Sequence, residues 1–479
     1  MHELNLIGVV IYKLMTIAAI IHVLMDNRQP AKTVAWVLVI YFVPVVGILF
    51  YLFIGINTRR KRLVSQRSMD QLTKRSMLEF VEQQNFNPPP EYATIIQLFT
   101  NQNMALPFQN NRTTFYTTGS DFFQELLQAI GKAQHHIHIN MYIFDADPIG
   151  RLIADALIDK ARQGVEVRVI YDDVGCWNVP NPFFEHMREA GIEVSAFLPV
   201  RFPLFTSKAN YRNHRKLIVI DGHTGFIGGM NIALRYVKGT QLGLWRDTMV
   251  KVEGGAVYGL QRAFLVDWYF VDRTLISKHL YYPTVSPTLS NQCLAQVVTS
   301  SPATLYPEIM QGLVHIILNA RRYLYIQTPY FLPTDSVLIA LKTAAVSGID
   351  VRLMVPLHND GHLVEWASRS YLREVAEAGI KVLFYADGFL HSKLIVSDDW
   401  LSSCGSTNID CRSFENNFEA NIFFYDTDTA ITCKRLFLDD EKHCQTMESW
   451  MNQGNAFPGK LPFLQRLLES ILRLMAPIL

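Results

Sequence analysis

Two long runs of apolar residues lie close together at the start of the chain. The first, from Asn5 to Met25, contains one strongly charged residue, Lys13, and the second, from Thr33 to Ile56, contains none. About 20 apolar residues are enough to cross a hydrocarbon core as a helix. The pattern predicts an N-terminal two-helix membrane anchor over residues 1–58. Pro44 interrupts the second run and can kink it, so a fully spanning and a re-entrant hairpin both stay open.

Basic residues are concentrated after the second run rather than in the turn before it. Four of them, Arg59 to Arg62, follow the run at once, whereas the turn contains only Arg28 and Lys32. Lysine and arginine are enriched in the cytoplasmic loops that flank membrane spans. We therefore expect a multi-pass protein whose larger C-terminal part lies in the cytoplasm, joined to the anchor by a basic juxtamembrane linker over residues 59–105.

From about Leu106 onward, one order of apolar and polar positions occurs twice. Segments 133–144 and 320–331 alternate between apolar and polar residues, as strands do, and each precedes a helical stretch and further strands. Such repeats predict an α/β fold with mixed, largely parallel sheets sandwiched by helices. We expect two pseudo-twofold-related units, over 106–285 and 286–450. The other matched segments are 149–164 with 336–348 for the helices, and 165–173 with 349–356 and 190–199 with 378–387 for the strands.

The composition bears on function mainly through charge and cysteine. With 44 basic and 43 acidic residues, the chain lacks the basic excess of most nucleic-acid-binding proteins. Its six cysteines show no metal-binding spacing and are expected to be reduced core residues. The histidines at positions 135, 136 and 138 lie in a strand pattern without nearby carboxylate or cysteine partners, so we interpret them as part of the fold rather than as a metal site.

The strongest functional signal is a duplicated motif. The sequence HRKLIVIDGHTGFIGGMN begins at His214, and HSKLIVSDDWLSSCGSTN begins at His391. Both fit H-x-K, four residues, Asp, six residues and G-x-x-N. One H-x-K is uninformative, but two copies with equal spacing at equal places in a repeat indicate a functional site. The candidate catalytic residues are His214, Lys216, Asp221, His391, Lys393 and Asp398.

These residue types suit phosphodiester chemistry. Residues two apart on a strand share a face, so the histidine and lysine of each copy point the same way. Lysine supplies positive charge for phosphoryl oxygens. One imidazole can attack phosphorus and form a phosphohistidine, while the other protonates the leaving alkoxide and then activates the incoming nucleophile. The lysines and backbone dipoles neutralise charge, so no metal or other cofactor is expected. The candidate phosphate-binding residues are Asn231, Ser406 and Asn408.

Each histidine also needs a partner that orients its second ring nitrogen. Glu419, eleven residues after Asn408, is the candidate in the second half. Asp247, sixteen residues after Asn231, is its counterpart in the first half. We expect both carboxylates to orient histidines.

Two further features of the motifs qualify this interpretation. Asp221 and Asp398 follow the motif strands, which favours a role in organising the site over one in proton transfer. The first copy has Gly229 where the second has Ser406, so the two halves are not expected to hold phosphate alike.

The duplicated motif resembles that of the phospholipase D superfamily, and the resemblance covers the chain from about Leu106. Other segments resemble the bacterial cardiolipin synthases of the A type. They are Arg28–Gly55, Trp366–Val382, Asn417–Asn421 and the tail Ala476–Leu479.

This resemblance implies an activity and a location. Two membrane phosphatidylglycerol molecules would become cardiolipin and glycerol, with His214 as nucleophile and His391 as acid and base. The near-symmetry of the halves leaves the opposite assignment open. The location implied is the bacterial cytoplasmic (inner) membrane.

Three other activities use the same residues. Water would resolve the intermediate in a hydrolytic phospholipase D, and another lipid such as phosphatidylethanolamine would serve in a different phosphatidyltransferase. A nuclease is disfavoured by the near-neutral charge and the apolar N-terminus, so no nucleic-acid partner is expected. A non-catalytic scaffold would leave two intact motifs unexplained. The sequence does not predict an oligomeric state.

The tail, residues 451–479, is amphipathic. From Leu461 to Leu479 its apolar residues have helical spacing, with Gln465, Arg466, Glu469 and Arg473 on the other side. Such a helix either lies in the membrane interface or packs on the core of the protein.

Overall fold

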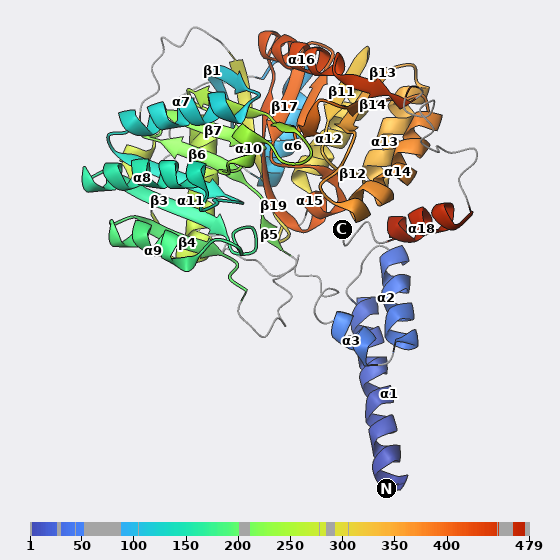
Figure 1. Ribbon diagram of the computed structural model, residues 1–479. Coiled ribbons are helices and arrows are strands. Elements are labelled where there is room, and N and C mark those ends of the chain that lie inside the picture. Colours follow the sequence, from blue (N-terminus) through green and yellow to red (C-terminus); the bar gives the residue numbers. More distant parts are fainter. Residues whose placement is uncertain are drawn as a thin grey trace.

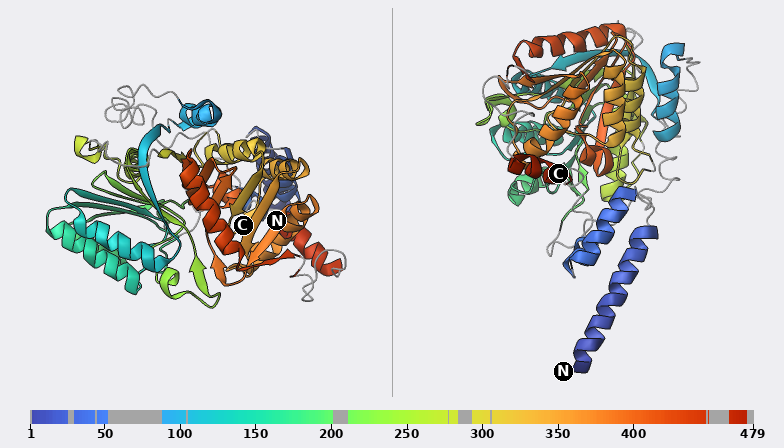
Figure 2. Two further views of the ribbon diagram at one scale, coloured as in Figure 1. Left: turned by 90° about the horizontal axis from the view of Figure 1, so that it is seen from above. Right: turned by 90° about the vertical axis from the view of Figure 1, so that its right-hand side faces the viewer.

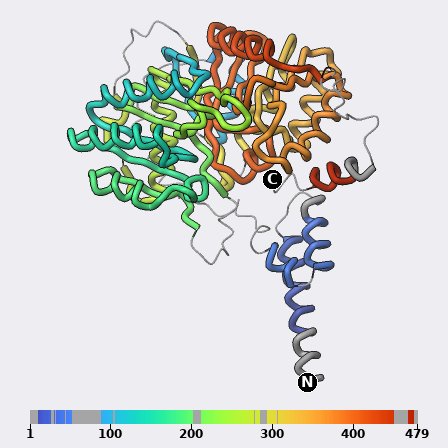
Figure 3. Tube along the Cα trace, viewed as in Figure 1, coloured from blue at the N-terminus to red at the C-terminus, as the bar shows by residue number. Residues whose placement is uncertain are grey.

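The structure is a computed structural model of the chain. It describes residues 2–25, 30–43, 45–51, 88–103, 105–200, 211–276, 278–283, 293–304, 306–447, 449 and 463–474. Figure 3 traces the chain through an N-terminal helical segment, a first half in cyan to green and a second half in yellow to red.

The N-terminal segment consists of α1 (His2–Met25), α2 (Pro30–Phe42) and α3 (Val46–Phe50). These helices project from one side of the two α/β halves (Figure 1). The second apolar run is divided between α2 and α3, and Pro44 lies outside the described residues. Among the described residues, no helix is both long enough and apolar enough to cross a membrane. The predicted transmembrane hairpin therefore stays a prediction.

In the first half, three parallel strands form one end of the sheet. They are β2 (His136–Met141), β3 (Glu166–Asp172) and β4 (Glu193–Phe197), connected by α8 (Pro148–Arg162) and α9 (Asn181–Glu189). Asp147 caps α8 by accepting the amides of Ile149 and Gly150. Gly164, with φ of 89°, follows the helix as the predicted stop.

Both faces of β2 are buried. Ile137, Ile139 and Met141 lie in the core beneath α8 and α7 (Gly119–Lys132). The opposite face lies beneath α11 (Val257–Asp272), where Gln261 is 2.8 Å from Nδ1 of His138 and 3.1 Å from Nε2 of His136. Burial lowers the pKa of His136 to about 4. These histidines are neutral members of the core, as the strand pattern predicts.

The next four strands along the sheet of the first half are antiparallel. They are β6 (Lys216–Ile220), β7 (Thr224–Gly228), β9 (Met249–Glu253) and β1 (Pro107–Tyr116). The prediction of a largely parallel sheet is wrong at this point. A tight turn at residues 221–223 joins β6 to β7, and a connection this short pairs strands only in antiparallel orientation.

The second half repeats this plan. Its parallel strands are β11 (Tyr323–Gln327), β13 (Asp350–Pro356) and β14 (Lys381–Tyr385), and its antiparallel strands are β16 (Leu394–Ser397), β17 (Leu401–Gly405), β19 (Asn417–Phe424), β10 (Cys293–Ser300) and the edge strand β20 (Cys444–Thr446). Helices α12 (Glu308–Asn319), α13 (Asp335–Val346) and α14 (His362–Glu377) cover one face, and α16 (Thr427–Glu441) covers the other.

The two halves share one sheet of sixteen strands. Strand β1 pairs antiparallel with β10, so the order from one edge to the other is β20-β14-β13-β11-β16-β17-β19-β10-β1-β9-β7-β6-β2-β3-β4, with β5 (Arg212–Asn213) beside β19. Once the edge strand β20 is set aside, three parallel strands are followed by antiparallel strands from either edge inward, and the two series meet at the β1–β10 pair. This symmetry is what the predicted pseudo-twofold relation requires. Figure 2 shows the halves side by side, with α7 and α8 (teal) as an outer layer over the first half. The six cysteines have free thiols, and all but Cys444 are buried, as predicted.

The predicted linker over residues 59–105 is wrong at its end. Helix α6 (Pro90–Asn103) packs into the core of the second half through Tyr92, Ile95, Ile96 and Phe99. The three- and four-residue spacing of these side chains is typical of a buried helix face. The earlier part of the predicted linker lies outside the described residues.

The tail helix α18 (Phe463–Leu474) lies against α14 with its polar side. Glu469 pairs with Arg373, and Arg473 pairs with Glu374 at 2.7 Å. Leu472 reaches the core, whereas four other apolar side chains are 41–81% exposed: Leu467, Leu468, Ile471 and Leu474. One face of the tail helix therefore packs on the protein, and contact of its exposed apolar side chains with a membrane interface stays a prediction.

Candidate active site

The two motif histidines occupy equivalent positions in the two halves. His214 follows β5, which runs parallel to the start of β19, and its amide donates to the carbonyl of Phe418 at 2.9 Å. His391 follows β15 (Gly388–Leu390), which runs parallel to β8 (Leu244–Arg246), and its amide donates to the carbonyl of Arg246 at 2.7 Å. The residues that follow Phe418 and Arg246 in the chain are the two candidate carboxylates, Glu419 and Asp247.

His214 is held by Glu419 of the second half. Nδ1 of the imidazole lies 3.0 and 3.1 Å from the two carboxylate oxygens of Glu419. The Ser406 hydroxyl donates to this carboxylate at 2.5 Å, and the Asn417 amide donates to it at 3.3 Å. Glu419 is fully buried, so these contacts fix both the carboxylate and the ring that it orients.

His391 is held by Asp247 of the first half. Its Nδ1 lies 2.6 Å from Oδ2 of Asp247, and the Thr248 amide donates to Oδ1 at 2.7 Å. Nζ of Lys393 lies 3.0 Å from the same Nδ1. A Cβ atom at Gly229 would lie 2.1 Å from Oδ1 of Asp247, so this carboxylate occupies the space that a side chain would need.

Each carboxylate predicted to orient a histidine therefore contacts a motif histidine, but across the halves, and the orienting role itself stays a prediction. The sequence arguments placed Glu419 and Asp247 in their own halves and did not predict that the pairs cross. Crossing follows from the short parallel pairings of β5 with β19 and of β15 with β8, which connect opposite halves. Neither half therefore contains both members of a histidine–carboxylate pair.

The paired groups lie in a low-dielectric environment. Burial lowers the pKa of His214 to about 4, although the Glu419 carboxylate opposes the shift. Burial likewise lowers the pKa of His391 to about 3, opposed by Asp247. Both rings are therefore neutral near pH 7 before substrate binds, and a neutral imidazole is the form that can act as nucleophile.

The motif lysines lie beside their histidines and are buried. Nζ of Lys216 donates to the carbonyl of His214 at 2.8 Å and lies 5.0 Å from the ring centre of Tyr142. Lys393 donates to the carbonyl of His391. Burial lowers the pKa of both lysines. Each amino group lies beside the histidine of its own motif.

Both histidines face one cavity of about 360 Å³. This volume falls in the range of small-molecule sites. Asn231 and Asn408 line the cavity as well, as do Arg235 and Arg412, which the sequence arguments missed. An arginine follows each motif asparagine by four residues, in N-I-x-x-R, so the repeat contained a signal for both.

The motif aspartates do not line this cavity, which corrects their place among the catalytic residues. Asp221 accepts the backbone amides of Gln134, His135 and His136 at 2.8–2.9 Å. Asp398 does the same for residues 321–323 at 2.7–2.9 Å. Each aspartate follows its motif strand, β6 or β16, at the end opposite the histidine. It joins that strand to the neighbouring β2 or β11. The expectation that they organise the site agrees with this geometry.

The three predicted phosphate-binding residues differ in position. Ser406 is fully buried and bound to Glu419, so it supports the carboxylate and does not reach the cavity, which corrects its assignment. The side chain of Asn231 accepts the Ile143 amide at 3.1 Å and donates to the Tyr236 hydroxyl at 3.0 Å. Phosphate binding by Asn231 and Asn408, which do line the cavity, stays a prediction.

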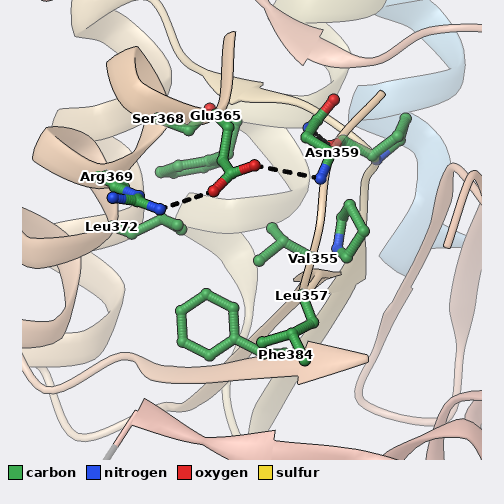
Figure 4. Close-up of a pocket in the computed structure, with 11 residues that line it drawn as sticks. Val355, Leu357, Asn359, Glu365, Ser368, Arg369, Leu372 and Phe384 are labelled. Atoms are coloured by element: carbon green, nitrogen blue, oxygen red, sulfur yellow. Dashed lines mark hydrogen bonds and ion pairs between the residues drawn. The ribbon is translucent and has the colours of Figure 1, made fainter. Parts of the chain in front are cut away.

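The loop that carries Asp360 forms one wall of the cavity. The Tyr330 hydroxyl donates to the Asp360 carboxylate at 2.9 Å. Near the start of α14, Glu365 accepts from Asn359 at 3.4 Å and from Arg369 at 2.7 Å, as the dashed lines in Figure 4 show. The pocket drawn there measures about 30 Å³, which suits a water molecule rather than a lipid headgroup. Its contacts fix the wall of the larger cavity.

Comparison with known proteins agrees with this site. The family described as cardiolipin synthase, PLD-like domain, matches residues 126–264 and 313–440. The family described as phospholipase D-nuclease N-terminal matches residues 14–55. A cardiolipin synthase from Geobacillus kaustophilus is 39% identical over 95% of this chain and 90% of its own length. The major cardiolipin synthase ClsA of Bacillus subtilis is 38% identical, with 96% of each chain covered.

A solved structure shows the same fold. The phosphatidylserine synthase of Haemophilus influenzae superimposes with a TM-score of 0.62 at 16% identity, covering 81% of this chain and all of that one. The predicted family and enzyme class are confirmed by the match to the PLD-like domain and by the near full-length relatives. The chain belongs to the cardiolipin synthase family of phospholipase D-like enzymes.

Proposed function

We propose that this enzyme transfers a phosphatidyl group from one phosphatidylglycerol to another, which gives cardiolipin and glycerol. The observation that carries the proposal is the convergence of two crossed imidazole–carboxylate pairs, His214–Glu419 and His391–Asp247, on one cavity. One pair supplies a nucleophile and the other supplies an acid and base, which is what a two-step displacement at phosphorus needs.

In the first step, Nε2 of His214 attacks the phosphorus of the donor lipid. The bond from phosphorus to the glycerol headgroup breaks, and His391 gives its proton to the departing alkoxide, so glycerol leaves. Because His391 is neutral in the free enzyme, the bound phosphate anion has to raise its pKa for this role. Lys216 and Lys393 stabilise the charge on the phosphoryl oxygens.

In the second step, His391 takes the proton of the headgroup hydroxyl of the second lipid. The hydroxyl oxygen forms a bond to phosphorus, and the electron pair of the phosphorus–nitrogen bond returns to His214. The chemistry is reversible, since glycerol can attack the same intermediate. His214 is favoured as nucleophile because its side chain is the more exposed of the two, at 12% against 7%.

The test is product analysis with the full-length protein in vesicles of headgroup-labelled phosphatidylglycerol. We expect cardiolipin and free labelled glycerol in equal amounts. Phosphatidic acid as the sole lipid product would replace the proposal by hydrolysis. With phosphatidylglycerol labelled in its phosphate instead, the label should accumulate covalently on His214 in His391→Ala. Adduct formation on His391 in a His214→Ala variant, and none in His391→Ala, would reverse the roles.

A membrane location, with the catalytic halves in the cytoplasm, is the second part of the proposal. Exposed apolar side chains gather on α1–α3 and on the outer side of α18. Figure 1 places β5 and α15 (Cys411–Glu415), which flank the active site, on the side from which α1–α3 project. Large exposed apolar areas are typical of contact with a partner or a membrane, and these lie on the side of the molecule that carries the proposed lipid site.

Vesicle flotation of the full-length protein tests the contribution of α18. The double variant Leu467→Asp/Leu474→Asp should bind phosphatidylglycerol vesicles roughly tenfold more weakly, because it loses buried apolar area. Leu152→Asp, at a 49% exposed position on α8, is the matched control. Unchanged binding by the double variant would remove α18 from the contact.

A further inference from the structure

The two cavity arginines occupy equivalent positions but differ in their contacts. Arg235 lies 3.6 Å from Asp145 and 5.5 Å from the ring centre of Trp245. For Arg412, the described residues supply no salt bridge and no side-chain hydrogen bond. The repeat has thus produced one arginine with an acidic partner and one whose guanidinium is available to an anion.

Arg412 belongs to the side of the cavity that contains His214. Its charge acts on the Tyr142 hydroxyl, where it opposes the rise in pKa that burial causes. The Tyr142 ring is centred 4.8 Å from the imidazole of His214. All three side chains line the cavity, so an anion bound by Arg412 would lie close to the phosphorus that His214 carries.

Two amide oxygens add a second kind of contact. Oδ1 of Asn408 and Oδ1 of Asn417 are buried, and no described group donates to them. The amide group of Asn417 is oriented by its donation to Glu419, and the Asn408 side chain hydrogen bonds with Asp410. Both residues line the cavity, so these two buried oxygens belong to its wall. Unpaired buried acceptors are costly and suit a ligand that brings hydroxyl donors.

A cation beside two acceptors matches the chemistry of the second lipid. The headgroup of phosphatidylglycerol is a glycerol whose free hydroxyls are donors and which is attached to the anionic phosphodiester. The donor phosphate occupies the histidines, so the acceptor phosphate needs a separate cation. Arginine is suited to this because its guanidinium can donate two parallel hydrogen bonds to phosphate.

We propose that Arg412, Asn408 and Asn417 form the acceptor subsite, in which Arg412 binds the phosphodiester of the second phosphatidylglycerol and the amides accept from the glycerol hydroxyl that does not react. This proposal rests on the proposed function. When the acceptor hydroxyl forms its bond to phosphorus, the phosphorus–nitrogen bond to His214 breaks and the hydroxyl proton passes to His391. Arg412 is then a positioning residue for the acceptor and takes no part in the first step.

Two assays on the same vesicles separate the acceptor from the donor. Exchange of free labelled glycerol into phosphatidylglycerol uses an acceptor that has hydroxyls but no phosphate. Cardiolipin formation uses an acceptor with both. Because the donor is identical, the ratio of the two rates reports how the enzyme uses the acceptor.

We expect Arg412→Ala to lower cardiolipin formation about 10- to 100-fold while glycerol exchange stays within about twofold of wild type. Exchange also shows that the variant is folded. Arg412→Lys should recover part of the loss, since it keeps the charge without the bidentate geometry. Arg435→Ala, at an exposed position on α16, is the control and should change neither rate.

Three outcomes would overturn the subsite. Equal loss of both activities in Arg412→Ala would place the residue on the donor phosphate or in the fold. Wild-type behaviour of Arg412→Ala would show that the acceptor does not use it. Selective loss of cardiolipin formation in Arg235→Ala instead would move the subsite to the first half. Failure of the proposed function is distinct, because wild-type enzyme would then form no cardiolipin at all.

Discussion

The His214 and His391 sites share one backbone plan but differ in how the carboxylate is held. Gly229 and Ser406 are equivalent, since their amides donate to the carbonyls that follow the two carboxylate residues, at 2.9 and 3.0 Å. In one site the Asp247 carboxylate lies where a Gly229 side chain would be. In the other, the longer Glu419 accepts from the Ser406 hydroxyl.

This difference explains two asymmetries of the sequence together: Gly229 against Ser406, and Asp247 against Glu419. Glycine with aspartate and serine with glutamate are alternative ways to fill the same space behind a histidine. The serine that the motif suggests as a phosphate ligand is instead part of the carboxylate support. The two sites are therefore matched in geometry and distinct in chemistry, and the variants that follow test how far that distinction extends.

Removing the charge of each orienting carboxylate should have the largest effect. Glu419→Gln and Asp247→Asn should each lower the overall rate roughly 10²- to 10⁴-fold, because the imidazole loses the group that sets its tautomer. Asp159→Asn, at an exposed position on α8, is the control. The measurement is steady-state cardiolipin formation.

A substrate with a good leaving group distinguishes the two carboxylates. A phosphatidyl ester of p-nitrophenol needs no proton from His391, so the first step of Asp247→Asn should return close to wild type. Glu419→Gln should stay slow, because the nucleophile itself is impaired. The initial burst of p-nitrophenolate reports this step. A burst restored in Glu419→Gln and absent in Asp247→Asn would exchange the roles of the two histidines.

Changing the residue behind each carboxylate should have an intermediate effect. In Gly229→Ala the new methyl group meets Oδ1 of Asp247 and displaces the whole carboxylate from His391. We therefore expect roughly a 10- to 100-fold loss of rate. Ser406→Ala removes one hydrogen bond to Glu419 and leaves its contacts with His214 and Asn417, so the loss should be about tenfold or less.

Exchange of the whole pair tests whether the two arrangements are true alternatives. Gly229→Ser combined with Asp247→Glu gives the first half the pair found in the second half. The double variant should be more active than Gly229→Ser alone, and a double-mutant cycle measures the coupling. Additive losses would mean that carboxylate length and the residue behind it are independent.

The sequence predicted much of this site because the relevant signals are local. Strand alternation, glycine stops and motif spacing all act over a few residues, and the parallel strands and their helices agree with them closely. The crossing of the carboxylates depends on β5 and β15, strands of two and three residues that pair with the opposite half. No periodic pattern can indicate pairings this short. The helix at residues 90–103 was missed for a different reason, since its apolar spacing is plain but its neighbours there are nearly 200 residues away.

The motif aspartates should show the smallest effect on rate and a clear effect on stability. Asp221→Ala and Asp398→Ala each leave three backbone amides without their acceptor, at a cost of about 1–3 kcal/mol per buried amide. Both aspartates have positive φ, 53° and 57°, which asparagine tolerates better than alanine. The asparagine variants should therefore lose less stability. Thermal unfolding measures the loss.

Asp398→Ala should lower Tm more than Asp221→Ala does, because Asp398 is the more buried and its carboxylate also accepts from the indole of Trp400. Below the unfolding transition, both alanine variants should keep kcat within about twofold, since neither carboxylate lines the cavity. A large fall in kcat at unchanged Tm would instead mean that the aspartates affect the chemistry from outside the cavity. It would also mean that contacts at the far ends of β6 and β16 are transmitted along the strands to the histidines, so that the two sites are coupled through the sheet and not only through the cavity they share.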